Sequence, residues 1–110
     1  MSTEVPDTWQ ILKFQRGSEP PIYKVFAGWY GGYTGGDSWQ LNSGIVSIKQ
    51  CNDRYEFTGQ SGSLYVCYMA CNKLSGYQHS ILDRWEKQLE GTGATVEIVP
   101  VKDIKLEIAE

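Results

Sequence analysis

The chain's candidates for metal binding are its three cysteines and its single histidine, namely Cys51, Cys67, Cys71 and His79. Zinc accepts thiolate and imidazole ligands, but the intervals of 15, 3 and 7 residues between these four match no zinc-binding spacing. If residues 64–71 form a strand, Cys67 and Cys71 lie about 13 Å apart at ~3.3 Å per residue, too far to share one ion. We therefore expect no metal site and no cofactor, and we interpret the cysteines as small apolar residues of a reducing compartment.

Nucleophilic catalysis by a serine or a cysteine usually requires a nearby base, and His79 is the only imidazole in the chain. The surrounding pattern places His79 in the first turn of a helix, where Ser75 and Asp83 are its neighbours. Cys67 and Cys71 belong to the most apolar segment, which lacks the electropositive setting of a reactive thiol. The sequence thus predicts no set of catalytic residues, and we expect a protein that is not an enzyme.

A glycine-rich loop at residues 31–37 has part of the spacing of a phosphate-binding loop. Asp37 stands where that motif requires lysine, and its carboxylate would repel a phosphate, so we expect a hairpin loop instead. Tyrosines lie beside and within the loop, and protein interfaces are enriched in tyrosine and poor in charge at their centre. We expect Tyr30, Tyr33 and Asp37 to be exposed residues that contact a protein partner.

The net charge of −3 lies entirely in the last third of the chain. Residues 1–78 hold six acidic and six basic side chains, whereas residues 79–110 hold seven acidic and four basic ones. An acidic face of this kind steers association with a basic partner surface, although a solvated helix and strand would also account for it. The residues expected to bind a protein partner are Asp83, Glu86, Glu90 and Glu97. The chain has no basic patch, so we expect no direct binding to nucleic acid.

Alternating apolar and polar residues predict strands over most of the chain. The predicted segments are residues 9–15, 22–29, 38–41, 45–49, 54–60, 64–71, 95–101 and 104–108. Residues 64–71 are apolar on both faces, which predicts a central strand covered on both sides. Trp29 and Trp39 are interpreted as core residues on neighbouring strands.

One segment has helical periodicity instead. Ser75 followed by Gln78 fits a capping box, and Gly91 fits a C-terminal cap, so we predict a helix over residues 76–90. Its apolar residues recur at intervals that place them on one face of the helix. These residues are Tyr77, Ile81, Leu82, Trp85 and Leu89.

The order of several strands, one helix and one or two further strands is typical of the α+β class. We predict a mainly antiparallel sheet of about five to seven strands, with the amphipathic helix packed on one face. The length of 110 residues fits a single domain over 1–110. No segment approaches the ~20 apolar residues that span a bilayer, and the N-terminal residues lack the features of a signal peptide. The sequence therefore predicts a soluble, cytoplasmic protein with no membrane contact.

These observations favour a non-enzymatic, acidic protein-binding module. The alternative is a small enzyme or a ligand- or metal-binding domain whose site is not visible in sequence. In size, acidity and lack of a catalytic motif, the chain is similar in kind to small accessory proteins of phages and mobile elements. Some of these, such as anti-CRISPR proteins, inhibit host nucleic-acid machinery by binding its basic surfaces. Exposed edge strands would also allow a homodimer.

Overall fold

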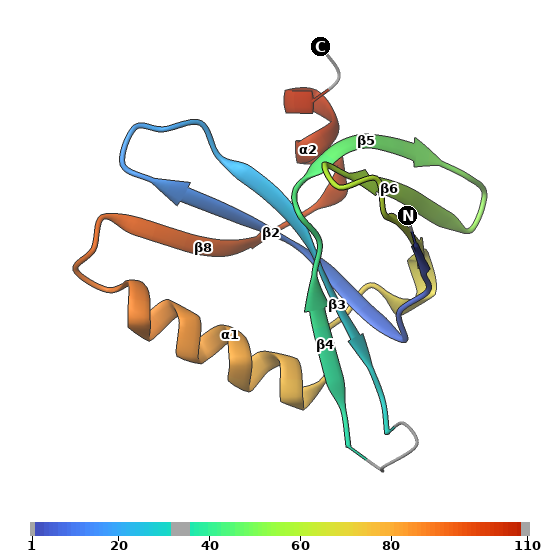
Figure 1. Cartoon of the computed structure of the whole chain (residues 1–110), viewed down its shortest axis with the longest axis horizontal. Helices are drawn as coiled ribbons and strands as arrows, with labels where there is room; N and C mark the ends of the chain where they lie inside the picture. Colours follow the sequence, from blue (N-terminus) through green and yellow to red (C-terminus); the bar gives the residue numbers. More distant parts are fainter. Residues whose placement is uncertain (1, 32–35, 109–110) are drawn as a thin grey trace.

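The computed structural model describes residues 2–31 and 36–108, with side chains described as far as residue 104. In this part of the chain, eight strands form two four-stranded sheets, accompanied by two α-helices (Figure 1). The strands are β1 Thr3–Glu4, β2 Thr8–Arg16, β3 Ile22–Trp29, β4 Ser38–Leu41, β5 Ile45–Gln50, β6 Arg54–Gly59, β7 Leu64–Tyr68 and β8 Ala94–Val99. The helices are α1 Gly76–Leu89 and α2 Val101–Ile108, and a 3₁₀ turn spans Met69–Cys71.

The sheet with strand order β4-β3-β2-β8 is antiparallel and forms the middle layer of the fold. The second sheet has the order β1-β7-β6-β5, in which β1 and β7 are parallel and the other pairs antiparallel. Successive side chains of a strand point to opposite faces. On β2, Ile11 therefore enters the core between the two sheets, while Leu12 enters a second core beneath α1. The middle sheet is thus covered by the second sheet on one face and by α1 on the other.

The core between the sheets is built around Trp9, which is fully buried. Its indole N–H donates a hydrogen bond to the carbonyl oxygen of Tyr68 at 2.7 Å, so the polar atom of the ring is satisfied. Its ring centroid lies 5.7 Å from that of Phe57 on β6. These contacts tie the first long strand of the middle sheet to the second sheet.

Helix α1 begins with the predicted capping box. The hydroxyl of Ser75 accepts a hydrogen bond from the amide of Gln78, and the side chain of Gln78 accepts one from the amide of Ser75. Gln78 is fully buried and also contacts the sheet. Its Oε1 accepts a hydrogen bond from the hydroxyl of Thr8, and its Nε2 donates one to the carbonyl oxygen of Phe26. The N-terminal turn of α1 is therefore bonded directly to β2 and β3.

The α+β class, the mainly antiparallel pairing and the helix packed on a sheet are confirmed. The structure differs in having eight strands in two sheets rather than five to seven in one. Within segment 64–71, β7 is central in its sheet, between β1 and β6, but it ends at Tyr68, a 3₁₀ turn follows, and the strand is not covered on both faces. The buried residues of β7, Tyr65 and Cys67, alternate with less buried ones, as expected for a strand with one covered face.

The prediction of a last strand over residues 104–108 is wrong, because these residues belong to α2. Pro100 ends β8, since proline cannot donate to a ladder, and its carbonyl accepts a hydrogen bond from the amide of Asp103 at 3.1 Å. Val101 and Ile104, three residues apart on the helix, both pack into the core between the sheets. That contact favours a helix over the strand that a short apolar alternation predicted.

Candidate functional site

The base of the glycine-rich loop is held by two carboxylates. The amide of Tyr30 donates to Asp7 Oδ2 at 2.9 Å, and the amide of Gly31 donates to Asp37 Oδ1 at the same distance. Tyr30 and Asp37 are both exposed, as expected, and Asp37 also has a structural hydrogen bond that the sequence did not reveal. The role of Asp7 was also missed, because it lies 23 residues from its partner. Tyr33 lies outside the described residues.

The two tryptophans near this loop differ in burial. Trp29 is half-buried against the core between the sheets, and its indole N–H donates to the carbonyl oxygen of Val5 at 3.0 Å. Trp39 lies on β4, at the edge of the middle sheet, and is 37% exposed, so its assignment to the core is wrong. Its ring centroid lies 5.1 Å from that of Trp85 on α1, so Trp39 packs against the outer part of the core beneath α1.

The cysteines and His79 are dispersed over the fold. Burial raises the pKa of the Cys67 thiol well above its ordinary value, and nearby Cys71 raises it further, so Cys67 is a protonated core residue. His79 is exposed on α1. Cys67 and Cys71 do not lie on one continuous strand, contrary to the expectation, because β7 ends at Tyr68 and Cys71 belongs to the 3₁₀ turn that follows. Within residues 2–31 and 36–108, no three His, Cys, Asp or Glu side chains are placed to hold a metal ion.

The described part of the chain contains ion pairs only around Arg54. Its guanidinium lies 3.0 Å from Asp53 Oδ1 and 3.3 Å from Glu56 Oε2. The hydrogen bond to Asp53 is the main cause that raises the pKa of Arg54. Both carboxylates therefore have an ion-pair partner within the chain.

The predicted acidic residues occupy two places. Asp83 and Glu86 are exposed on the same side of α1, because residues three apart share a helix face, and Glu90, the residue that follows the last residue of the helix, is exposed as well. Glu97 is exposed on β8, where it pairs in register with Lys13 of β2. The structure does not bring all four acids onto one face of the sheet.

Successive side chains of β8 point to opposite faces of the sheet, and this explains why Glu97 lies apart from the other three acidic residues. Val96 packs into the core beneath α1, whereas Val99 packs into the core between the two sheets. Glu97 shares the face of Val99, so it points away from the helix side. The sequence showed the alternation but did not show which face α1 would cover.

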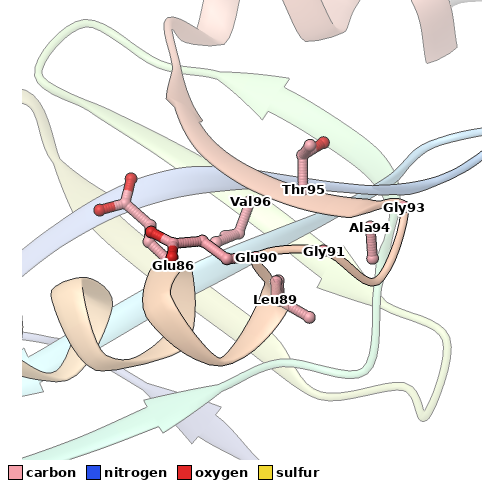
Figure 2. A pocket seen from close by; sticks show the side chains of 8 residues that line it. All are labelled: Glu86, Leu89, Glu90, Gly91, Gly93, Ala94, Thr95 and Val96. Atoms are coloured by element: carbon pink, nitrogen blue, oxygen red, sulfur yellow. The ribbon is translucent and has the colours of Figure 1, made fainter.

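Glu86 and Glu90 border a hollow of about 480 Å³ between the end of α1 and β8, named here the α1–β8 groove. Figure 2 shows the side chains of Glu86 and Glu90 at the end of α1, together with Val96 of β8. The groove is lined by Glu86, Leu89, Glu90, Gly91, Gly93, Ala94, Thr95 and Val96. Its apolar floor and its carboxylates would have been hard to find from sequence, since they come from two elements that meet only in the fold.

Further hollows adjoin this groove. One of about 250 Å³ shares Leu89, Ala94 and Thr95 with it and extends toward Phe14 and Ile22. Another of about 200 Å³ also borders Leu89 and is lined by Phe14 and Trp85. Leu89, at the C-terminal end of α1, therefore borders three hollows with mainly apolar linings.

The chain matches no known protein family, no characterised protein and no solved structure. In the described residues, neither helix has the length and apolarity needed to cross a membrane.

Proposed function

We propose that this protein is a non-enzymatic binding module that takes a basic surface of a partner protein into the α1–β8 groove. The observation that carries the proposal is the pair Glu86 and Glu90. Both are exposed beside an apolar floor, and neither has an ion-pair partner within the described residues. Two uncompensated carboxylates next to apolar surface are suited to a ligand that is apolar along its length and cationic at its tip.

Lysine and arginine side chains have this form, because an aliphatic stem carries the charged group. In the groove, the stem contacts Leu89 and Val96 while the cation reaches Glu86 and Glu90. The C-terminal end of a helix carries partial negative charge, which adds to the attraction for a cation. A volume of about 480 Å³ is enough for a large side chain and its neighbours.

A protein that binds nucleic acid offers a partner surface of this chemistry, because its phosphate contacts come from lysine and arginine. Occupying that surface would block nucleic acid, so the module would act as an inhibitor in the manner of small phage or mobile-element accessory proteins. The acidic last third of the chain would increase the association rate with such a surface at low salt.

The test is capture of protein partners from a nuclease-treated bacterial lysate by the tagged chain, read by mass spectrometry. Three forms are compared: wild type, Glu86→Gln/Glu90→Gln and the control Ser47→Lys/Asn52→Lys. Both double variants raise the net charge by two, and the control residues are exposed on and beside β5, in the other sheet.

We expect wild type and the control to retain one stoichiometric partner and the glutamine variant to lose it. Loss of about tenfold or more in affinity is typical when charged hydrogen bonds are removed. Equal loss in both double variants would show that binding follows net charge and not the groove. A partner retained fully by Glu86→Gln/Glu90→Gln would overturn the proposal.

A further inference from the structure

The four edge strands of the two sheets differ in how open they are to a further strand. β1 has two residues and β4 has four. β5 has six, but its ladder is interrupted by a register shift between Ile45 and Ser47. β8 also has six residues, and it pairs with β2 in continuous register from Ala94 to Val99. Short edges and bulges are devices that prevent strand addition, and β8 lacks both.

Within the described residues, β8 is hydrogen-bonded to β2 alone. Every second residue of an edge strand points its N–H and C=O groups away from its neighbour, where an added strand can bind them. Pro100 follows directly and ends the edge, which limits an added strand to about the length of β8.

The side chains of β8 offer a different chemistry on each face. Val96 and Ile98 face the α1 side, where Val96 lines the α1–β8 groove and Ile98 is 40% exposed. Glu97 lies between them and faces the opposite side. The edge is therefore flanked by carboxylates on both faces, Glu86 and Glu90 on one and Glu97 on the other.

We infer that the partner contributes an extended basic segment, which binds by adding a strand to the edge of β8; this inference rests on the proposed function. Side chains of the added strand alternate between the two faces. The residue beside Val96 is lysine or arginine and reaches Glu86 and Glu90. Its neighbour in the segment, beside Glu97, is also basic, and the next residue is apolar and packs on Ile98.

The recognised pattern is therefore two basic residues followed or preceded by one apolar residue, according to the direction of the added strand. A second copy of this chain is a poorer occupant of the same edge. Pairing β8 with itself would bring Glu86, Glu90 and Glu97 close to the same three residues of the other copy, and like charges across a ladder are destabilising.

The probe is a capped peptide with the sequence Ser-Thr-Val-Thr-Val-Arg-Arg-Val-Thr-Ser, titrated into the full chain. An apolar residue stands on each side of the basic pair, so the peptide satisfies the pattern in either strand direction. Two further peptides carry N-methyl groups on every second backbone nitrogen. One peptide is methylated at the odd-numbered residues and the other at the even-numbered residues. Only one set of peptide amides faces β8, so we expect one methylated peptide to bind like the parent and the other to lose at least about tenfold in affinity. Amide hydrogen exchange should slow at alternate residues of β8 when the parent peptide binds.

Equal affinity of the two methylated peptides, no binding of the parent, or unchanged exchange in β8 would each overturn strand addition. A dimer with protected β8 amides in the absence of peptide would do so as well, because the edge would then be occupied by a second copy. The Glu86→Gln/Glu90→Gln variant separates the two proposals. If it loses the lysate partner while the peptide results fail, the groove function stands and strand addition falls. If it retains that partner, both fall.

Discussion

Replacing Gly28 by alanine would place a methyl group against the buried side chain of Gln78. A Cβ atom at this position would lie 2.4 Å from Cδ, 2.5 Å from Oε1 and 2.8 Å from Nε2 of that side chain. Carbon atoms in van der Waals contact stay about 3.5–4.0 Å apart, so the glutamine must move. Its freedom to move is small, because it is fully buried and bonded to Ser75, Thr8 and Phe26.

These contacts set the loss in the free energy of unfolding that Gly28→Ala should cause. Overpacking a core costs about 1–3 kcal/mol, and each hydrogen bond lost contributes about 1 kcal/mol more. We expect Gly28→Ala to lower the free energy of unfolding by about 3 kcal/mol, which corresponds to a fall of about 12 °C in Tm. Gly76→Ala is the matched control. A Cβ atom at Gly76 meets nothing within 4 Å, and alanine favours a helix, so its effect should be neutral or stabilising by about 0.5–1 kcal/mol.

Urea denaturation of Gly28→Ala, Gln78→Ala and the double variant measures the coupling between the two positions. We expect Gln78→Ala alone to cost about 3 kcal/mol, because it removes the side-chain half of the capping box and the buried hydrogen bonds to Thr8 and Phe26. The double variant should cost close to that amount and not the sum of the two, since the methyl group then has space. A Gly28→Ala cost below about 0.5 kcal/mol, or additive costs in the double variant, would refute this account of how α1 is attached to the sheet.

Two further outcomes follow from buried residues. Because burial raises the pKa of Cys67, the folded chain keeps this proton after the unfolded chain has lost it. The contribution of Cys67 to the free energy of unfolding is therefore full below pH ~8.5, the pKa of an unfolded cysteine, and declines above it. In urea denaturation, the free energy of unfolding of Cys67→Val should vary less with pH over this range. Ile104→Ala should cost about 2–5 kcal/mol, because Ile104 of α2 is fully buried; a cost near zero for this variant would show that α2 does not pack on the core.

Some of this architecture could be read from local patterns. The capping box and the apolar face of α1 depend on residues within one helix, so its start was predicted at the correct residue and its end within one. The burial of Gln78 could not be read in this way. It depends on Gly28 and Thr8, which lie about 50 and 70 residues away in the chain.

The two-sheet arrangement shows the same limit. β2 alternates weakly in the sequence, and the structure shows why: Trp9, Ile11 and Leu12 are all buried, because β2 has a core on each face. The strands covered on both sides therefore belong to the middle sheet, with β2 among them, and segment 64–71 is not one of them. In the site, the exposure of Glu86 and Glu90 followed from helical periodicity, whereas the apolar floor beside them required the placement of β8.

The placement of β8 beside α1 is fixed at both ends of the helix, and this bears on how the groove would bind. At the N-terminal end, Gln78 bonds the helix to the sheet. At the other end, the amide and hydroxyl of Thr92 donate to the carbonyl oxygen of Leu89 at 3.1 and 2.6 Å. Gly91 adopts a φ of 76°, which lets the chain reverse directly into β8. Because the backbone that carries Glu86, Glu90 and Val96 is fixed before a ligand arrives, binding would require ordering of the glutamate side chains but little ordering of the backbone, and selectivity would follow from the spacing between these residues and the edge of β8.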